Sequence, residues 1–276
     1  MFTLNCNGRL LIIDKPIVMG IINTTPDSFF GDSRKYTLDA ALKQAEAMLQ
    51  QGATILDIGG QSTRPGSELV GENEESDRVL PVIESIAKTF SSAFISVDTF
   101  YASVARQSTA AGATIINDIS GGTIDANMLR TVGSLRVPYI CMHIKGSPQT
   151  MQQYATYEDV VKEVLDYFIQ KLSDCRAAGI NDVIIDPGFG FAKTITHNFK
   201  LLRHLSVLNI LERPLLVGLS RKGTVQKTLN VTAAEALNGT TVLNTIALLN
   251  GAHILRVHDV KEAMEAIQLV EAFKGS

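Results

Sequence analysis

Short apolar runs rich in β-branched residues alternate along the chain with longer amphipathic segments. Runs of this length are typical of strands covered on both faces, as in a parallel sheet. The segments between them have the helical period; in residues 37–52, for example, the apolar side chains share one helix face. The predicted strands are residues 17–23, 54–60, 94–100, 114–120, 138–144, 182–188, 214–220 and 253–259.

Glycine marks the ends of several predicted helices. Gly52, Gly179 and Gly251 each follow a helical pattern, at the position where glycine most often ends a helix. The segment 157–179 is the longest of these patterns. Strands and helices therefore alternate over nearly the whole chain, which predicts a TIM (β/α)₈ barrel. An open doubly wound sheet is the alternative, but no GxGxxG turn follows the first predicted strand.

The N-terminal residues have a different pattern. Polar and apolar residues alternate in "FTLNCNGRLLII" around Asn7 and Gly8, which predicts a β-hairpin preceding the first barrel strand and covering the barrel floor. No Pro/Ser/Gly-rich linker divides the sequence. We therefore expect residues 1–276 to form a single domain.

Composition narrows the class of protein. The chain has 276 residues, 45% of them hydrophobic, and a formal net charge of −3, which gives no reason to expect nucleic acid or an anionic membrane as partner. Its three cysteines are scattered and form no CxxC pair, which favours a reducing compartment. Asp14, Lys15 and Pro16 interrupt the first apolar stretch, so it resembles neither a signal peptide nor a membrane span. We expect a soluble, cytoplasmic protein.

Polar residues collect where the predicted strands end, whereas the strand starts carry no comparable set. In a (β/α)₈ barrel the active site is built at the carboxyl ends of the strands. This asymmetry predicts an enzyme or a tight small-molecule binder. The strand-end residues are Asn23, Asp57, Asp98, Asn117, Asp118, His143, Asp186, Ser220, Arg221, Lys222, Arg256 and His258.

One group of these residues could surround an anion. Arg64, Lys222, Arg256 and His258 could supply positive charge, and Thr63 a hydroxyl donor. Arginine matches phosphate oxygens with a planar fork, whereas lysine acts as a point charge. Barrels often bind phosphate near the loops after their seventh and eighth strands, where three of these residues lie. A phosphate-containing ligand is the prediction.

A second group could recognise a planar heterocycle. The carboxylates of Asp98 and Asp186 can accept hydrogen bonds from ring N–H and amino groups, and the Asn117 amide can both donate and accept. Phe189 or Phe191, which follow Asp186, can offer a stacking face.

Other strand-end residues have a structural interpretation. We interpret Asp57 and Asp118 as partners of backbone groups, a common role of aspartate at strand ends. The sequence leaves open whether His143 is structural or functional.

Asn23 is the candidate metal ligand. An asparagine oxygen with few carboxylates nearby suits Mg²⁺ held mainly by water and substrate phosphate. The sequence contains no HExxH, Walker A or Ser-His-Asp signature and no lone lysine in mid-strand.

The strand-end strings resemble those of dihydropteroate synthases, in order and over essentially the whole chain. They are "MGIINTTPDSF", "DIGGQSTRPG", "SVDTF", "INDISGG", "MHIKGSPQTMQ", "DPGFGFAKT", "GLSRK" and "RVHDV". The resemblance implies a TIM-barrel transferase of folate biosynthesis, usually a homodimer and a sulfonamide target. Such an enzyme joins p-aminobenzoate to 6-hydroxymethyl-7,8-dihydropterin pyrophosphate and releases pyrophosphate and 7,8-dihydropteroate.

The resemblance also implies roles for individual residues. It assigns pterin binding to Asp98, Asn117, Asp186 and Lys222, and pyrophosphate binding to Thr63, Arg64, Arg256 and His258. The aminobenzoate slot falls on Pro65, Phe191 and Lys222, and the Mg²⁺ ligand is Asn23. Asp98, Lys222, Arg256 and His258 are the expected catalytic set.

Two places depart from the family pattern. The first loop reads "SFFGDSR", where many members have a form like "SFSDGG". Gly223 stands where members commonly have a serine near the aminobenzoate carboxylate. We expect the loss of that hydroxyl to weaken aminobenzoate binding.

Three other functions share parts of this pattern. A non-catalytic paralogue would keep the barrel and the pterin pocket. A pterin-binding methyltransferase with a corrinoid partner would have no pyrophosphate for the "STRPG" loop to bind. An unrelated phosphate-binding isomerase or lyase would need an acid–base pair that the sequence does not show.

Overall fold

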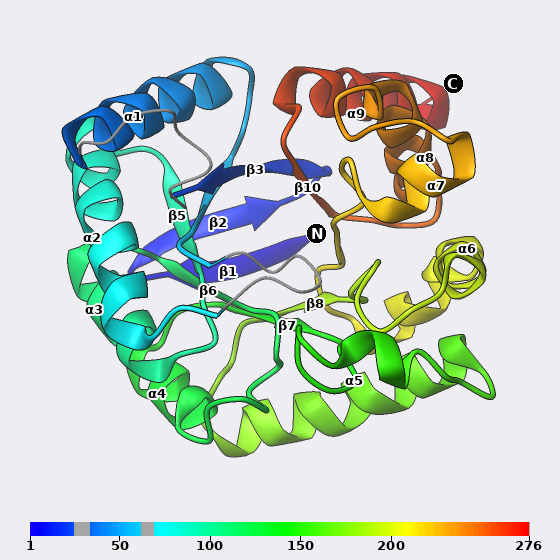
Figure 1. The fold of residues 1–276 in the computed structure, drawn as a ribbon, viewed down its shortest axis with the longest axis horizontal. Helices are drawn as coiled ribbons and strands as arrows, with labels where there is room; N and C mark the ends of the chain where they lie inside the picture. Colours follow the sequence, from blue (N-terminus) through cyan, green and yellow to red (C-terminus); the bar gives the residue numbers. More distant parts are fainter. Residues whose placement is uncertain (25–33, 62–68, 276) are drawn as a thin grey trace.

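The computed structural model describes residues 1–24, 34–61 and 69–275, and within them eight parallel strands follow one another in chain order around a ring (Figure 1). β10 pairs with β3, and a single parallel bridge between Ile185 and Leu215 closes the ring between β8 and β9. The predicted TIM barrel is therefore confirmed. Its strands are β3 (Ile17–Asn23), β4 (Ile55–Gly59), β5 (Phe94–Asp98), β6 (Ile115–Asp118), β7 (Tyr139–Met142), β8 (Val183–Asp186), β9 (Leu216–Val217) and β10 (Ile254–Val257).

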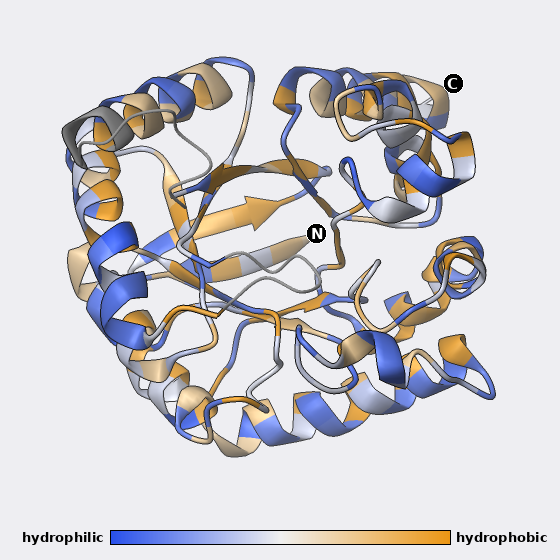
Figure 2. Cartoon of the chain, in the orientation of Figure 1, coloured by the Kyte–Doolittle hydropathy of each residue, from blue (hydrophilic) through white to orange (hydrophobic). Residues whose placement is uncertain are grey.

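α-Helices surround this ring, and Figure 2 shows their alternation of hydrophilic and hydrophobic faces beside the more uniformly apolar strands. Gly52, Gly179 and Gly251 all have the positive φ expected of a residue that ends a helix. The helices are α1 (Arg34–Gln50), α2 (Glu72–Thr89), α3 (Ala102–Ala111), α4 (Met128–Leu135), α5 (Val160–Ala177), α6 (Ile195–Arg203), α7 (Gly223–Leu229), α8 (Leu237–Leu249) and α9 (Val260–Gly275), with 3₁₀ turns Met151–Tyr154 and Leu205–Leu211.

The N-terminal hairpin covers the floor of the barrel, as predicted. β1 (Phe2–Cys6) and β2 (Arg9–Ile13) are antiparallel, and Asn7 and Gly8 between them have φ values of 55° and 85°. Positive φ at both turn residues matches the strand twist in two-residue hairpins. The buried side of the hairpin packs against the first inward-facing layer of the barrel. That floor cluster contains Leu4, Cys6, Leu11, Ile13, Met19, Ile55, Ile115, Ile140, Ile184, Leu216 and Ile254.

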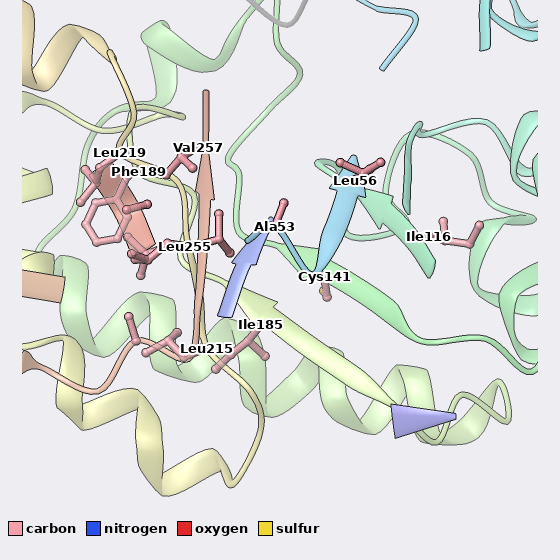
Figure 3. Packing of buried hydrophobic residues seen from close by; sticks show 14 of the residues in the cluster. Ala53, Leu56, Ile116, Cys141, Ile185, Phe189, Leu215, Leu219, Leu255 and Val257 are labelled. Atoms are coloured by element: carbon pink, nitrogen blue, oxygen red, sulfur yellow. The ribbon is translucent and has the colours of Figure 1, made fainter. Parts of the chain in front are cut away.

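Alternate residues of each strand face outward into a second core between sheet and helices. Figure 3 shows part of this layer, with Leu56, Ile116, Cys141, Ile185 and Leu255 among its buried members. Because side chains alternate along a strand, inward positions are two residues apart. Asp57 lies two residues beyond the floor residue Ile55 of the same strand, and this spacing fixes which polar residues face the barrel mouth.

Candidate active site

The inward positions beyond the floor layer carry polar side chains on several adjacent strands. In the parallel register, Asn23 is opposite Gly59, Gly59 is opposite Asp98, and Asp98 is opposite Asn117. Asp186 and Arg256 each lie two residues beyond a floor residue of their strands, Ile184 and Ile254. The strand ends therefore bring together the predicted heterocycle-reading residues and one of the predicted anion-binding residues.

Arg256 is the centre of this polar layer. Its Nε and Nη2 lie 2.7 Å and 2.6 Å from Asp57 Oδ2, and Nη2 also donates to Asp98 Oδ2 at 2.7 Å. The Asn117 amide donates to the same Asp57 oxygen at 3.0 Å. Within the described part of the chain, Arg256 Nη1 makes no hydrogen bond, so this nitrogen is free to contact an anionic ligand.

Our interpretation of Asp57 as a backbone partner is wrong. The carboxylate is fully buried, ion-paired with Arg256 and hydrogen-bonded to Asn117. Asp57 lies on the same, inward side of β4 as Ile55 and Gly59. The interpretation was wrong because the apolar residues on either side of Asp57 conceal this inward position in the sequence. Its other oxygen, Oδ1, is buried without a hydrogen-bond partner among the described residues.

Asp118, by contrast, has the structural role that the sequence predicts. It occupies the outward position beside inward-facing Asn117, and Oδ1 accepts the backbone N–H of Ser120 at 2.7 Å. Oδ2 accepts from the backbone N–H of Gly122 at 2.8 Å and from the Tyr139 hydroxyl at 2.7 Å. Asp118 therefore shapes the loop after β6 and does not face the barrel mouth.

Burial sets the protonation of the inward carboxylates. It raises the pKa of Asp98 to about 7, an effect that the positive charge of Arg256 opposes and the negative charge of Asp57 adds to. Burial also raises the pKa of Asp186, while Lys222 and the backbone N–H of Gly188 lower it. Asp98 therefore changes charge near neutral pH.

Lys222 follows β9, and its charge interacts with those of Asp186 and Asp98. Its Nζ donates to the Phe189 carbonyl at 2.6 Å and lies 4.7 Å from the centre of the Phe191 ring. Burial lowers the pKa of Lys222 to about 8, although the charge of Asp186 acts in the opposite direction. The Cβ position of Gly218 is 3.7 Å from Lys222 Nζ and 3.8 Å from Arg256 Cβ, so the two cationic side chains flank one glycine.

His258 is held by Ser220. The backbone N–H of His258 donates to Ser220 Oγ at 3.2 Å, and the same hydroxyl is 3.1 Å from the ring Nδ1. Because Oγ accepts the N–H, its own proton can go to Nδ1, which leaves the ring proton on Nε2. Loss of hydration and then the charge of Arg256 lower the pKa of His258 to about 4. His258, which the sequence suggested as a source of positive charge, is therefore a neutral N–H donor at pH 7.

Arg221 faces away from this cluster. Its guanidinium donates to both oxygens of Asp259 at 2.8 Å and also to the carbonyls of Ala233 and Ala234. It ties the turn before α7 to the start of α9. Of the "SRK" string, Ser220 and Lys222 therefore belong to the site, and Arg221 supports it.

The question that the sequence left open for His143 has a structural answer. The ring is buried, lies edge-on to Tyr167 at 4.8 Å, and its Nδ1 is 2.9 Å from Lys193 Nζ. It follows inward-facing Met142 and therefore points to the outward side of β7. His143 is a packing and hydrogen-bonding residue.

Some predicted site residues lie outside the described residues. They are Thr63, Arg64 and Pro65, together with most of the first loop. Residues on either side of this loop are described: Gln61 donates to the Val70 carbonyl at 2.8 Å and accepts the Val70 N–H at 3.1 Å. Gln61 also donates to buried Glu75 at 2.7 Å. The contact between Gln61 and Glu75 was not predicted from the sequence, where its one signal is the glutamine inside the family string "DIGGQSTRPG".

Asn23 has the chemistry to contact a metal ion but not to hold one alone. Its Oδ1 and Asp98 Oδ2 are each 3.9 Å from the position that a Cβ of Gly59 would occupy. Among the described residues no group of three or more His, Cys, Asp or Glu side chains could hold a metal. A Mg²⁺ ion here would therefore take most of its oxygens from substrate and water, which fits the donors present.

No helix in the described part of the chain is long and apolar enough to cross a membrane.

The fold and the site together define a barrel enzyme of the pterin-binding class. The model of the family described as "Pterin binding enzyme" matches residues 19–258.

Relatives specify the family further. The chain is 45% identical over 267 residues to the dihydropteroate synthase of Escherichia coli K12, covering 96% of this chain and 94% of the relative. The structure of the Yersinia pestis dihydropteroate synthase with a sulfonamide drug complex has a TM-score of 0.94 at 44% identity and covers 100% of both chains. That of the Xanthomonas albilineans dihydropteroate synthase with 4-aminobenzoic acid has a TM-score of 0.92 at 39% identity, over 99% of this chain and 98% of the other. The chain belongs to the dihydropteroate synthase family, whose members are transferases of folate biosynthesis.

Proposed function

We propose that this chain joins the amino nitrogen of p-aminobenzoate to the methylene carbon of 6-hydroxymethyl-7,8-dihydropterin pyrophosphate. The new C–N bond replaces the C–O bond to pyrophosphate, and the amine loses one proton, which water or the released pyrophosphate can accept. A protein base is not required because an arylamine is neutral and nucleophilic at pH 7. The observation that carries this proposal is the cluster in which Arg256 contacts Asp57 and Asp98, beside Lys222 and Asp186.

The pterin pocket in this proposal consists of Asp98, Asn117, Asp186 and Lys222. The carboxylates accept hydrogen bonds from the ring N–H and amino groups of the pterin, and Lys222 donates to a ring acceptor. Asp186 Oδ1 is already occupied by the Gly188 N–H at 2.8 Å, whereas Oδ2 has no hydrogen-bond partner within the described residues. That free oxygen is the acceptor available to a ligand.

The pyrophosphate is placed against Arg256 and His258, with Thr63 and Arg64 as further contacts. Burial acts to lower the pKa of Arg256, but Asp57 and Asp98 raise it above the usual range, so the side chain keeps its charge. Its Nη1, which makes no hydrogen bond to a described residue, can donate to phosphate. His258 donates from Nε2. Asn23 would hold Mg²⁺, which when bound supplies positive charge for the departing pyrophosphate.

Asp98 is our candidate for the residue that stabilises positive charge on the pterin methylene as pyrophosphate leaves. Charges fixed in a buried site favour a transition state in which opposite charge develops. This dissociative hypothesis predicts scrambling of isotope between bridging and non-bridging pyrophosphate oxygens in unreacted substrate. No such exchange, and no slowing by substituents that destabilise the cation, would contradict it.

The aminobenzoate slot is proposed between Pro65, Phe191 and the stem of Lys222. The Phe191 ring under the Lys222 ammonium gives this slot one aromatic and one aliphatic wall. A sulfonamide that resembles the aminobenzoate in shape would compete for the slot. The proposal therefore includes competitive inhibition by sulfonamides.

We also propose that the enzyme is a cytoplasmic homodimer. The cysteines Cys6, Cys141 and Cys175 are free and buried, which suits a reducing compartment.

The proposed dimer contact is on α8, where the apolar side chains Val242, Ile246 and Leu249 lie along one face and are 50%, 36% and 50% exposed. Such a stripe is typical of a subunit contact. Sedimentation should give twice the mass of the chain, and Val242→Glu should yield a monomer; a monomeric wild type would contradict the proposal.

One assay separates this function from the alternatives. Purified protein is mixed with Mg²⁺, the pterin pyrophosphate and p-aminobenzoate, and both pyrophosphate release and dihydropteroate formation are followed. We expect steady release that stops when p-aminobenzoate is omitted. Pterin binding without turnover would favour a non-catalytic paralogue, and methyl transfer from methyltetrahydrofolate to a corrinoid protein would favour the methyltransferase.

A further inference from the structure

The loop of residues 187–193 after β8 carries the Phe191 wall of the proposed slot, and it is unusually constrained. Gly188, Gly190 and Ala192 all have positive φ, and a Cβ at Gly188 would clash with the His143 carbonyl oxygen. Phe189, at the middle of the loop, is fully buried beside Leu219 and Val257 (Figure 3). In such a buried loop, each backbone carbonyl needs a hydrogen-bond donor.

Lys193 satisfies two of these carbonyls from inside the loop. Its Nζ donates to the carbonyls of Gly188 at 3.0 Å and Phe191 at 3.1 Å, lies 2.9 Å from His143 Nδ1, and has a longer contact of 3.5 Å to the His143 carbonyl. An ammonium group has three hydrogens, and the three shorter contacts match them in number. Since His143 Nδ1 is then an acceptor, the ring carries its proton on Nε2.

The position of Lys193 is unusual for a lysine. The residue is 4% exposed, and within the described residues no carboxylate lies within ion-pair distance of its ammonium group. Burial lowers its pKa to about 7, and the strongest opposing effect is the negative charge of Asp186. Lysine is rarely buried without a paired charge, so packing alone does not account for a lysine at this position.

The influence between Lys193 and Asp186 acts in both directions. The charge of Lys193 lowers the pKa of Asp186, as do those of Lys222 and Arg256. On its own side, Lys193 is surrounded by His143 and by the charges of Lys145 and Lys222. Lys193 is thus a third cation acting on Asp186. The two residues are also linked through Gly188, whose carbonyl accepts from Lys193 at 3.0 Å and whose backbone N–H donates to Asp186 Oδ1 at 2.8 Å.

We propose that Lys193 is a positioning residue of this site, which holds the 187–193 loop so that Phe191 faces the aminobenzoate slot and which supports Asp186 as an acceptor through Gly188, the residue that contacts both side chains. This inference rests on the proposed function, because it assigns purposes to Phe191 and Asp186 in that reaction. Lys193 itself touches neither substrate.

The test compares Lys193→Met with two matched variants. Tyr157→Phe removes another anchor of the same loop, the 2.9 Å hydrogen bond from the Tyr157 hydroxyl to the Ala192 carbonyl, without changing any charge. Lys193→Arg keeps the charge. Lys88→Met makes the same substitution at an exposed lysine near the end of α2 and serves as the control for the assay.

Turnover and binding are measured separately. For Lys193→Met we expect the KM for p-aminobenzoate to rise about tenfold or more, since a displacement of about 1 Å at a positioned group can cost about 100-fold. The dissociation constant for 6-hydroxymethylpterin, measured by calorimetry from pH 5 to pH 8, should begin to rise at a higher pH than in the wild type. Loss of a neighbouring cation raises the pKa of Asp186, so its acceptor is lost earlier as the pH falls.

The controls decide which part of the proposal holds. In both Tyr157→Phe and Lys193→Arg, the dissociation constant for 6-hydroxymethylpterin should begin to rise at the same pH as in the wild type. We call this rise at low pH the acid limb of pterin binding, or pH limb. Folding is checked by circular dichroism. Should Lys193→Met not fold, Lys193→Gln, which keeps N–H donors without the charge, carries the pH arm of the test, and Tyr157→Phe, which removes the other loop hydrogen bond, carries the KM arm.

A folded Lys193→Met variant with wild-type KM values and a wild-type pH limb would overturn the inference. If the pH limb of pterin binding shifts as far in Tyr157→Phe as in Lys193→Met, Lys193 acts only as a loop anchor, and its effect on Asp186 through charge is overturned. Absence of turnover in the wild type would instead contradict the proposed function, and the pterin-binding arm would still test Lys193.

Discussion

The two ends of the barrel strands have opposite chemistry although only two residues separate them. On β10 the floor residue Ile254 is followed at the next inward position by Arg256, and on β8 Ile184 is followed by Asp186. The hairpin seals the floor with apolar side chains, whereas the rim buries ion pairs and carboxylates. Stability at the floor comes from burial of apolar area, and at the rim each charge depends on its partner.

This contrast gives a practical rule for the molecule. A substitution at the floor should change the free energy of unfolding with little effect on turnover. A substitution at the rim should change both, because a charge left without its partner is costly and the same charge contacts substrate. The following experiments test this separation.

Arg256→Met is expected to have the largest effect. Removing the guanidinium leaves Asp57 buried and uncompensated, so the free energy of unfolding should fall by about 3–5 kcal/mol. The kcat should fall about 10²–10³-fold, since one donor to developing charge is lost. Urea unfolding and pyrophosphate release measure the two effects.

The floor residue of the same strand provides the control for Arg256→Met. Ile254→Val should lose only about 0.5–1.5 kcal/mol and keep wild-type kinetic constants. An Arg256→Met variant that behaves like Ile254→Val would remove the distinction between the two ends.

Asp186→Asn should weaken pterin binding about 10–150-fold, because a charged hydrogen bond contributes about 1.5–3 kcal/mol. Calorimetric titration with 6-hydroxymethylpterin gives the affinity. Asp182→Asn, at the floor end next to β8, is the matched control. That aspartate accepts the Asn5 backbone N–H at 2.8 Å, so the change concerns the hairpin and should leave pterin affinity unchanged. Equal affinities of wild type and Asp186→Asn would exclude Asp186 from the pocket.

The rim charges predict a bell-shaped dependence of kcat/KM for the pterin pyrophosphate on pH. Activity should rise through about pH 7 as Asp98 ionises, because burial has raised its pKa to about 7. It should fall above about pH 8 as Lys222, whose pKa is lowered to about 8, loses its proton. Lys222→Arg should shift the descending limb to higher pH. A profile that is flat from pH 6 to pH 9 would contradict both assignments.

Gly223→Ser is the smallest predicted change. Gly223 begins α7, and nothing lies within 4 Å of the position that its Cβ would take, so a serine fits without strain. A restored hydroxyl near the aminobenzoate carboxylate should contribute about 0.5–1.5 kcal/mol and lower the KM for p-aminobenzoate about two- to tenfold. An unchanged KM would show that residue 223 does not contact that substrate.

The sequence was sufficient for the fold because its main signals are local. The β-branched runs, the helix-ending glycines and the Asn7-Gly8 turn each specify an element without reference to the rest of the chain. The ring arrangement then follows from the strict alternation of strand and helix.

The site was predicted less completely because it depends on partners distant in sequence. Asp57 has apolar neighbours, and only its ion pair with Arg256 reveals its role. His258 has the sequence appearance of a cation, yet its surroundings keep it neutral at pH 7. Lys193 falls inside a family string, but its hydrogen bonds to His143, Gly188 and Phe191 depend on the folded loop. A pattern along the chain contains none of these relations.

The most direct test of the account is a crystal structure of this chain with Mg²⁺ and 6-hydroxymethyl-7,8-dihydropterin pyrophosphate, in the absence of p-aminobenzoate. We expect the pterin ring against Asp98, Asn117 and Asp186, with the pyrophosphate extending to Arg256 and His258. A pterin ring bound away from Asp186, or a pyrophosphate directed away from Arg256, would contradict the claim that one rim serves both halves of a single substrate.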